Sequence, residues 1–392
     1  MIPAVLPTYN RAPLAFVSGK GSWLTSEDGS RYLDLGAGIA VNALGHAHPA
    51  LVETLSAQAQ KLWHVSNIYK IPEQERLAEM LVDRTFADTV FFTNSGTEAA
   101  ELAIKMARKH HYEAGHPERT QIIAFEGAFH GRSTGAIAAA GSEKMTKGYG
   151  PLMPGFTQIK WADHDAIRAA ITDQTCAVII EPIQGEGGIR PVPDQCLKGL
   201  RDLCDSTGTL LIFDEVQCGM GRTGKLFAHE WAGVTPDIMM VAKGIGGGFP
   251  LGAVLATEHA ASGMTAGSHG STYGGNPLGC AIGAKVTEIV SDPAFLDAVS
   301  QKAAQFRQGL EGLVASHPKV FEAVRGQGLI LGLKCVVSNA DVVKAGYGRH
   351  ILTVAAADNV LRLLPALNIP DADITEALSR LYAIASDLEA TL

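Results

Sequence analysis

The sequence predicts an α/β protein built on a largely parallel sheet, and three observations support this fold class. Short apolar runs recur between about residues 89 and 257, and several are too continuously apolar for strands with one solvent-facing side. Segments with helical spacing lie between many of these runs, as expected for a parallel sheet covered by helices. The chain has 392 residues, well beyond the roughly 150 of a typical domain, so smaller units should accompany the large one.

Taken in order, residues 14–36 come first and predict a small antiparallel meander, because Gly-containing turns separate their apolar runs. Seven runs then predict a mostly parallel seven-stranded sheet: TVFFTN, QIIAFEG, TQIKWA, CAVIIEPI, LLIFDEV, DIMMVAKG and LGAVLAT. Helices are expected between them at GTEAAELAIKMARKH, DHDAIRAAI and DQCLKGLRDLCDSTG. The glycine that ends the last of these suits a helix C-cap.

The C-terminal part predicts a separate α+β unit. Residues 293–316 have the pattern of a long helix, VFEAVRGQGLILGLKC that of strands, and DITEALSRLYAIASDLEATL that of a final helix. We therefore expect a large domain at 46–285 and a smaller α+β domain built from both termini, residues 1–45 and 286–392.

The composition limits the function. With 46% hydrophobic residues, 18% charged residues and a net charge of -8, the chain has the composition of an ordinary globular protein, and no basic run suggests nucleic-acid binding. Neither a signal-peptide pattern nor a run of about 20 apolar residues is visible, so we expect a cytoplasmic protein that does not contact membranes. Six dispersed cysteines without a CxxC spacing predict free thiols: Cys176, Cys196, Cys204, Cys218, Cys280 and Cys335.

Several short runs resemble known ligand-binding motifs but lack a residue or spacing that the motif requires. The run GMGRTGKL at 219–226 has the lysine of a phosphate-binding loop, but Leu226 stands where Ser or Thr should hold magnesium. The glycine run GIGGGFP lacks the spacing of a dinucleotide fingerprint. No metal site is expected, because the paired histidines lack companions at ligand spacing and are interpreted as turn or surface residues: His46, His48, His110 and His111.

Four segments make sense together if they surround one cofactor, and the first two follow apolar strands directly. In TNSGTEAAELAIKMAR, Asn94 and the three small residues 95–97 open a helix whose N-terminus favours an anion such as phosphate, although Ser95 could simply cap it. In LLIFDEVQCG, Asp214 and Glu215 end a buried strand and need a cationic partner. The pyridinium nitrogen of pyridoxal phosphate is one such partner, and a structural salt bridge is the alternative.

The other two segments supply an amine and hydroxyl groups. Lys243 ends the apolar run DIMMVA, where burial favours the free amine that forms a Schiff base; a lysine that reaches to solvent is the alternative. The glycines after it let backbone approach a ligand closely. In SHGSTYGGNPLGCA, Ser271 and Thr272 could donate to phosphate or substrate, or the loop could be a turn-rich entry to a helix at about Pro277.

Taken together, these segments resemble the class III, fold-type I aminotransferases over nearly the whole chain, and most of all the bacterial acetylornithine-type members. The motifs that carry the resemblance occur in the family's order: GIAVNALGHAHP, NSGTEA, AFHGRS, EPIQGEGG, LLIFDEVQ, AKGIGGG and GSTYGGNPL. The resemblance implies the pyridoxal-phosphate-dependent transferase fold of type I. It also implies a homodimer whose active sites contain residues of both subunits.

The resemblance further assigns roles by position. Lys243 would bind the cofactor covalently and Asp214 would hold its pyridinium nitrogen, which makes these two the catalytic residues. The implied cofactor-binding residues are Ser95, Gly96, Thr97, Phe129, Asp214, Glu215, Val216, Gln217, Lys243 and, from the other subunit, Thr272. The implied substrate-binding residues are Arg132, Glu186, Ser271 and Arg362. A core aromatic remains the alternative for Phe129, and surface salt bridges remain the alternative for both arginines.

The implied reaction is a ping-pong transfer of the ω-amino group of N2-acetylornithine to 2-oxoglutarate, giving N-acetylglutamate 5-semialdehyde and glutamate in arginine biosynthesis. Gly38 stands where the ornithine-specific members tend to carry a tyrosine, and the missing bulk suits an acylated donor. Ornithine, succinylornithine, N-succinyl-diaminopimelate and 4-aminobutyrate remain alternative donors. A racemase or aminomutase on the same fold, or a ligand-binding protein without activity, remains a further alternative.

Overall fold

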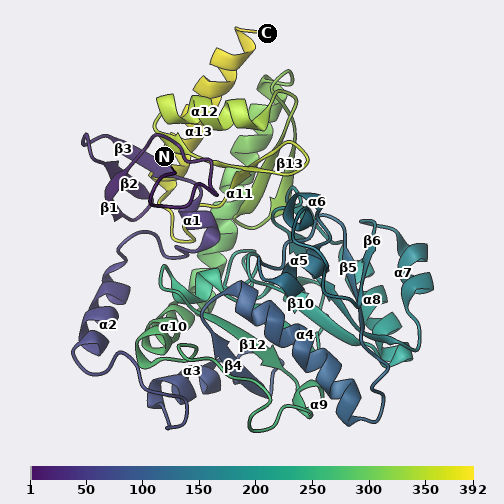
Figure 1. Ribbon diagram of the computed structural model, residues 1–392. Coiled ribbons are helices and arrows are strands. Elements are labelled where there is room, and N and C mark those ends of the chain that lie inside the picture. The colour runs from purple at the N-terminus through teal and green to yellow at the C-terminus, as the bar shows by residue number, and fades with distance from the viewer. Residues whose placement is uncertain (1) are drawn as a thin grey trace.

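The computed structural model describes residues 2–392, and its largest element is a seven-stranded sheet of order β4-β12-β11-β10-β7-β5-β6 (Figure 1). Its strands are β4 (Thr89–Thr93), β5 (Gln121–Phe125), β6 (Phe156–Ile159), β7 (Thr175–Ile180), β10 (Leu210–Asp214), β11 (Ile238–Val241) and β12 (Gly252–Ala256). Within this sheet β12 is antiparallel to both of its neighbours, and the remaining strand pairs are parallel. The predicted mostly parallel sheet is confirmed.

Both faces of this sheet are buried, which explains the continuously apolar runs. On β10, Ile212 packs beneath α4 (Gly96–Glu113), whereas its neighbour Leu211 packs on the opposite side with α7 (His164–Ala170) and α8 (Asp194–Thr207). Because successive side chains of a strand point to opposite faces, every position has to be apolar. Gly208 ends α8 in a left-handed conformation, as its sequence predicts.

Shorter elements complete the large part of the chain. They are α2 (Pro49–Ala59), α3 (Pro72–Val82), α5 (Thr134–Ala140), α6 (Glu143–Thr146), α9 (Glu258–Ala261), α10 (Pro277–Val290), the 3-10 turns η1 (Ala228–Trp231) and η2 (Lys243–Gly246), and the hairpin of β8 (Ile183–Gln184) and β9 (Arg190–Pro191). Helix α10 packs against α2 and α3 and begins after Asn276, whose side chain accepts a hydrogen bond from Gly279 N.

The smaller part of the molecule contains two four-stranded sheets, of order β1-β2-β3-β15 and β13-β14-β17-β16. Its elements are β1 (Phe16–Lys20), β2 (Trp23–Ser26), β3 (Arg31–Asp34), α1 (Ala37–Ala40), α11 (Pro293–Ser316), β13 (Phe321–Gln327), β14 (Ile330–Cys335), α12 (Asn339–Gly348), β15 (Ile351–Leu352), β16 (Val354–Ala356), β17 (Val360–Leu363) and α13 (Asp371–Glu389). The antiparallel meander and the long helix α11 are where the sequence predicts them. The last helix starts two residues earlier than predicted, directly after Pro370.

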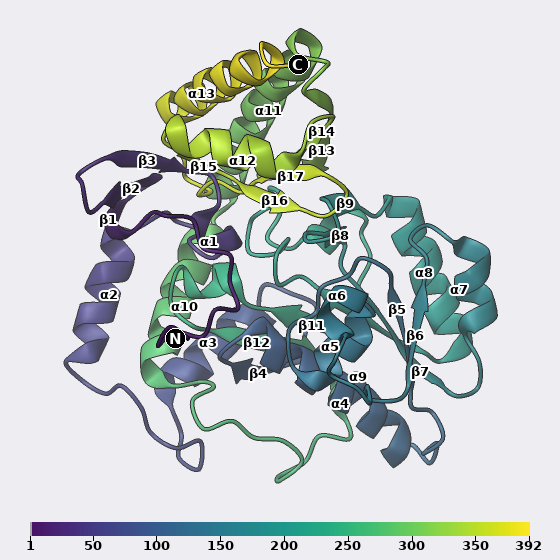
Figure 2. The same ribbon diagram turned by 45° about the horizontal axis from the view of Figure 1, so that its top comes forward.

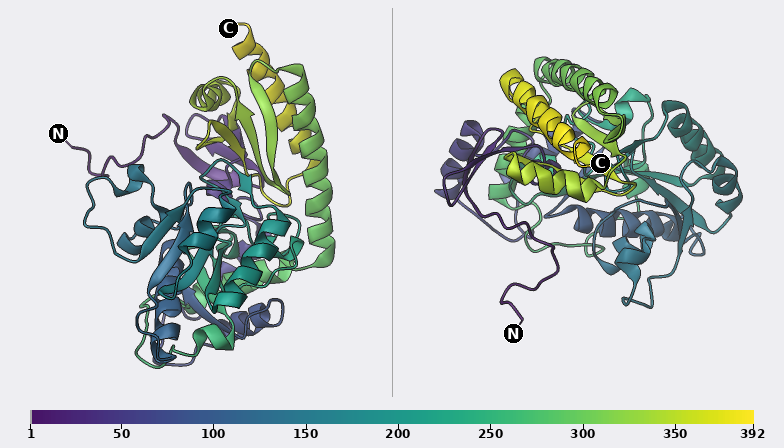
Figure 3. Two further views of the ribbon diagram at one scale, coloured as in Figure 1. Left: turned by 90° about the vertical axis from the view of Figure 1, so that its right-hand side faces the viewer. Right: turned by 90° about the horizontal axis from the view of Figure 1, so that it is seen from above.

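The two ends of the chain meet in one sheet. Strand β15 pairs in parallel with β3, with Ile351 opposite Leu33 (Figure 2). Helix α11 runs along the side of this lobe toward the large sheet, and the N-terminal segment projects away from the body (Figure 3). The division into 1–45, 46–285 and 286–392 stays a prediction.

Two further findings concern the sequence-based expectations. The interpretation of His110 and His111 as turn or surface residues is wrong, because both lie in the last turn of α4 and are buried. They continue the apolar helix face, and His111 Nε2 lies 3.0 Å from the Cys176 carbonyl oxygen. The six cysteines are free thiols in this structure. No helix within residues 2–392 has the length and apolar character needed to cross a membrane.

Candidate active site

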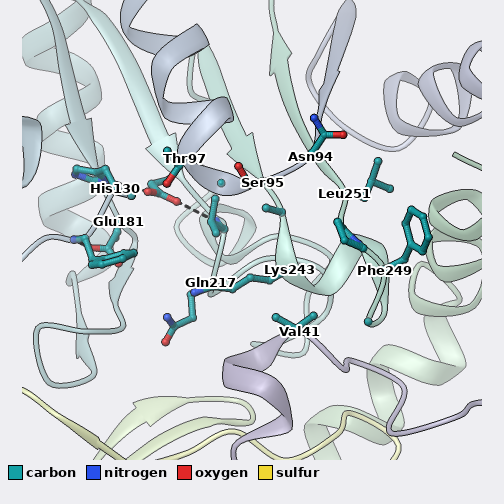
Figure 4. A pocket seen from close by; sticks show the side chains of 18 residues that line it. Val41, Asn94, Ser95, Thr97, His130, Glu181, Gln217, Lys243, Phe249 and Leu251 are labelled. Atoms are coloured by element: carbon teal, nitrogen blue, oxygen red, sulfur yellow. Dashed lines mark hydrogen bonds and ion pairs between the residues drawn. The ribbon is translucent and has the colours of Figure 1, made fainter. Parts of the chain in front are cut away.

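A cavity of about 320 Å³ lies where β10 and β11 end and α4 begins (Figure 4). Ligands of parallel sheets bind at this carboxyl edge. Residues from four of the predicted motifs line it, including Gly96, Phe129, Asp214 and Lys243. The structure therefore brings together residues that are far apart in the chain, such as Gly96 and Lys243, which are separated by 147 positions.

The first turn of α4 forms one wall of the cavity. Ser95 is the N-cap, and its Oγ accepts a hydrogen bond from Glu98 N at 3.3 Å, so the capping alternative describes this side chain. The N–H groups that open an α-helix have no partner within the helix, and they favour an anion. A Cβ on Gly96 would lie 2.9 Å from Val216 Cγ1, so only glycine fits this approach of helix start to cavity wall.

The segment after β5 packs closely on the same helix start. Gly131 has φ of 130°, and a Cβ there would lie 2.3 Å from Thr97 Oγ1. Thr97 Oγ1 accepts a hydrogen bond from Arg132 N at 2.9 Å. The Arg132 guanidinium is exposed and lies 5.4 Å from the Phe129 ring centroid. Phe129 thus lines the cavity, whereas Arg132 does not.

Asp214 lies at the floor of the cavity and binds a buried histidine. Its Oδ2 lies 2.8 Å from His130 Nδ1, and its Oδ1 accepts a hydrogen bond from Val216 N at 3.0 Å. Burial alone would lower the pKa of His130, but the hydrogen bond and negative charge of Asp214 outweigh it, so that this pKa is raised.

A second buried carboxyl group, Glu181, follows β7 beside this pair. It accepts hydrogen bonds from Phe129 N at 3.1 Å and Gly185 N at 3.2 Å. Burial, and then the negative charge of Asp214, raise the pKa of Glu181 to about 7. The cavity floor therefore contains a group that changes charge near neutral pH.

Lys243 follows β11 and carries a strained backbone. Its φ of 50° lies in the left-handed region, which costs a non-glycine residue roughly 1–2 kcal/mol. Burial lowers the pKa of its amine and the nearby Arg362 lowers it further, against the opposing effect of Glu186 and two other carboxylates. A lysine held this way presents a neutral amine more readily than one in water.

The C-terminal lobe contributes a cation on the same side as Lys243. Arg362 on β17 is 1% exposed, and its Nη1 donates to Glu186 Oε1 at 2.5 Å and to Gln217 Oε1 at 2.9 Å. Burial would raise the pKa of Glu186, but the charge of Arg362 outweighs it and lowers that pKa. The Nε of Arg362 is buried without a hydrogen-bond partner.

Comparison with known proteins identifies the family to which this arrangement belongs. The family described as aminotransferase class-III matches residues 6–385. The chain is a class-III aminotransferase. A curated relative, the acetylornithine aminotransferase of Rhodobacter capsulatus, is 72% identical over 389 residues, which cover 99% of each chain.

Two solved structures of related enzymes share the fold. The N-acetylornithine aminotransferase of Stenotrophomonas maltophilia is 37% identical, with a TM-score of 0.86 over 98% of each chain. An ornithine aminotransferase of Toxoplasma gondii, with partial occupancy of pyridoxal phosphate at its active site, is 31% identical, with a TM-score of 0.94 over 99% of this chain and 93% of that one. The predicted fold-type I architecture is confirmed.

In this aminotransferase, one of the predicted cofactor-binding residues, Glu215, lies outside the cavity. The Glu215 carboxylate accepts hydrogen bonds from Ala228 N at 2.6 Å and His229 N at 2.8 Å, and lies 2.8 Å from His229 Nδ1. It is completely buried and does not line the cavity. The residue alternates with Asp214 and Val216 along the chain and therefore points away from the cavity that they line.

The aminotransferase's fourth motif lies at the edge of the cavity. Ser271 Oγ accepts a hydrogen bond from Gly274 N at 2.9 Å and one from Asn94 Nδ2 at 3.4 Å. Thr272 is exposed and does not contribute to the cavity of its own chain.

Sequence reasoning missed His130 and Glu181 as site residues. Both lie just beyond the carboxyl end of a parallel strand, as Asp214 does at the end of its own. The rule that these strand ends meet at one edge of the sheet would have identified them.

The residues of this class-III aminotransferase fit pyridoxal phosphate. The helix start suits a phosphate, the Asp214 carboxylate suits a protonated ring nitrogen, and the buried Lys243 amine suits an aldehyde. Gly96 itself adds no side chain to the helix start, where Val216 already packs closely against it.

Proposed function

We propose that this protein transfers the ω-amino group of N2-acetylornithine to 2-oxoglutarate, with pyridoxal phosphate as cofactor, as a step of arginine biosynthesis. The observation that carries the proposal is the 72% identity to an acetylornithine aminotransferase over 99% of both chains. A pocket for one acylated amine discriminates poorly against a similar one, so succinylornithine is the alternative donor that most needs testing.

The cavity supports specific roles for its residues toward the cofactor. The N–H groups of Gly96 and Thr97 would hold the phosphate, the Asp214 carboxylate would hold the ring nitrogen, and Gln217 would reach the ring hydroxyl. Phe129 and Val216 line the same cavity and would pack on the ring. When bound, pyridoxal phosphate supplies an aldehyde that takes up the amino group and a ring that withdraws electrons.

Lys243 is proposed to move the proton in each half of the reaction. Its Nζ, kept neutral by burial, would accept the proton from the donor carbon that carries the transferred amine. The same Nζ would then deliver a proton to the aldehyde carbon of the cofactor, C4′. Lys243 lines the cavity, so its amine would reach the cofactor there.

Arg362 and Glu186 are proposed to distinguish the two substrates. With acetylornithine bound, whose transferred amine is on a carbon without a carboxylate, Glu186 would stay on the guanidinium, as it does in this structure. A dicarboxylate such as 2-oxoglutarate would displace Glu186 and bind Arg362 through a carboxylate, because a guanidinium binds carboxylates in a fork. Arg132, exposed beside Phe129, would hold the α-carboxylate of the donor, with Ser271 nearby.

We further propose a homodimer with shared active sites in the cytoplasm. Thr272 is exposed and absent from its own cavity, which is consistent with a role in a neighbour's site. Residues 62–69 pack on this loop through Asn67, whose Nδ2 donates to Ser271 O at 3.1 Å. Large apolar side chains on both segments are exposed: Trp63, Ile68, Tyr69 and Tyr273. The free cysteines suit a reducing compartment.

The first experiment is an absorbance spectrum of the purified protein with pyridoxal phosphate. N-acetylornithine alone should bleach the band of the bound cofactor, and 2-oxoglutarate should restore it. Parallel samples receive succinylornithine, ornithine and 4-aminobutyrate. A band that responds only to other amines would overturn the proposed donor, and turnover without any keto acid would indicate a racemase or aminomutase. No band after cofactor addition would overturn the proposed function.

The shared site has its own test. Lys243→Ala and Thr272→Ala homodimers are mixed under conditions of subunit exchange. Activity above that of either variant alone supports sharing, because mixed dimers would contain one site with both native residues. If mixing restores nothing, each chain forms its site alone.

A further inference from the structure

Three ionisable side chains meet beneath the cavity, and only Asp214 has a role in the proposed reaction. His130 follows β5, Glu181 follows β7 and Asp214 ends β10. These strands are neighbours in the order β10-β7-β5, so their carboxyl ends lie side by side. Figure 4 shows His130 and Glu181 among the cavity residues. His130 is 2% exposed, Asp214 3% and Glu181 5%.

The contacts fix the arrangement of the Asp214 carboxylate. One oxygen accepts the Val216 N–H at 3.0 Å and the other lies 2.8 Å from His130 Nδ1. Since an ionised carboxylate can only accept, His130 Nδ1 has to carry the hydrogen. Without His130, one oxygen of this buried anion would lose its only side-chain partner, and the carboxylate could rotate or take up a proton.

Glu181 places a second carboxyl group against the same pair. Its two oxygens accept the N–H groups of Phe129 and Gly185, which ties it to the residue next to His130. The charged groups that face His130 are Asp214 and Glu181, and Lys243 faces the two carboxyl groups from η2. Two buried carboxylates beside one imidazolium leave an excess negative charge, which a proton on Glu181 removes.

We propose that His130 is a positioning residue: its imidazolium holds Asp214 as an oriented anion toward the ring nitrogen of the cofactor, and Glu181 takes up and releases the proton of this three-residue unit. The proposal rests on the proposed function, because Asp214 needs a cationic ring nitrogen to hold. The 2.8 Å contact of His130 Nδ1 with the Asp214 carboxylate, and the nearby Glu181, favour the charged form of the imidazole.

The first test reads the charge of His130 directly. The full-length protein is prepared with ¹⁵N-labelled histidine, and the ring signals are followed from pH 6 to 9, with and without pyridoxal phosphate. We expect one imidazole, absent in His130→Asn, to stay doubly protonated at pH 8 and to become neutral in Asp214→Asn. In Glu181→Gln, the change in these ring signals that accompanies the titration of Glu181 near neutral pH should disappear. A neutral His130 at pH 7 in the wild type overturns the proposal.

The second test measures cofactor affinity without using turnover. Dissociation constants are measured for pyridoxal phosphate and for its analogue with CH in place of the ring nitrogen. His130→Leu should weaken pyridoxal phosphate binding at least tenfold and binding of the analogue less than threefold. His130→Asn, which keeps a donor near the Nδ1 position without the charge, should fall between wild type and His130→Leu.

His229→Asn is the matched control, because His229 Nδ1 lies 2.8 Å from a buried carboxylate that does not line the cavity. It should leave both dissociation constants within twofold of wild type. Equal weakening of both ligands in His130→Leu would indicate a structural role only and overturn the proposal, as would unchanged affinity. If the wild type itself does not bind pyridoxal phosphate, the proposed function has failed, which the analogue series distinguishes from a failure of His130 alone.

Discussion

Two adjacent carboxylates at the end of β10 contact histidines in the same way but differ in their other hydrogen bonds and in whether they border the cavity. Asp214 Oδ2 and Glu215 Oε1 each lie 2.8 Å from a histidine Nδ1. The Glu215 carboxylate is saturated, because two backbone N–H groups also donate to it. The Asp214 pair borders a cavity, and its histidine leaves Nε2 unpartnered. Buried polar groups are normally satisfied, so an incompletely satisfied pair indicates a ligand site and a saturated one indicates support of the fold.

The largest effect expected from this comparison is on activity at Asp214. Asp214→Asn keeps an oxygen for the His130 contact but removes the negative charge opposite the ring nitrogen. Turnover should fall by about a thousandfold, the range found when one preorganised electrostatic group is removed. Steady-state kcat/KM with N-acetylornithine measures this. The melting temperature should stay close to that of the wild type, and a large drop in it would assign Asp214 a structural role instead.

Glu215 should show the opposite behaviour. Glu215→Gln places a side-chain amide NH2 against backbone N–H groups and removes the charge that pairs with His229, which should destabilise the fold by about 3 kcal/mol. Urea unfolding measures the change, and turnover per folded molecule should remain within about threefold of wild type. The comparison breaks down if the variant is as stable as the wild type but inactive.

A third buried pair extends the comparison to the C-terminal lobe. Arg362 also leaves a buried nitrogen, Nε, unpartnered, so it should serve a ligand. Arg362→Lys keeps the charge but not the fork, and the KM for 2-oxoglutarate should rise about 10- to 100-fold, the equivalent of one or two charge-assisted hydrogen bonds.

The donor half-reaction provides the contrast for Arg362. In Arg362→Lys, the KM for N-acetylornithine should change less than about threefold, because this donor leaves the guanidinium of the wild type paired with Glu186. Arg325→Lys is the matched control, since Arg325 lies on β13 and pairs with Asp358 outside the cavity. Equal rises in both KM values for Arg362→Lys would contradict a role in distinguishing the substrates.

The smallest expected effect is a pH dependence of stability from Glu181. Its pKa of about 7 lies above the ordinary value of 4.5, so the folded state holds this proton more tightly than the unfolded chain does. The resulting stabilisation is complete below about pH 4.5 and is lost as the pH rises to about 7. Between pH 6 and 7 the loss should be about 1 kcal/mol.

Urea unfolding of wild type and Glu181→Gln over pH 5 to 8 measures this dependence. The stability difference between the two proteins should shrink as the pH rises, because the glutamine cannot ionise. A difference that stays constant over this range would show that Glu181 does not titrate there.

The sequence predicts the strands well and the partners of the site less well, for a physical reason. Runs such as LLIFD are apolar at every position because both sheet faces are buried, and this pattern is local. The order of strands is not local. The contact of His130 with Asp214 depends on β5, β7 and β10 being neighbours, which nothing within either motif specifies.

That Glu215 lies outside the cavity could not be read from its motif, for a related reason. The resemblance assigns Glu215 to the cofactor together with Asp214, but neighbouring positions at a strand end face opposite ways. The partner of Glu215, His229, lies in η1, whose packing against the strand end is visible only in the folded chain. His110 and His111 were interpreted as turn or surface residues because they lack companions at metal-ligand spacing, but polar side chains on an otherwise apolar helix face are buried with it.

The pairing of β15 with β3 affects how the chain folds while it is being synthesised. The sheet that contains the first strands of the chain needs Ile351 and Leu352 to be complete. During synthesis on the ribosome, one edge of β3 therefore stays unpaired until β15 has been synthesised, which is after all strands of the large sheet. An exposed strand edge can pair with other chains, so the nascent chain is prone to aggregation during this interval.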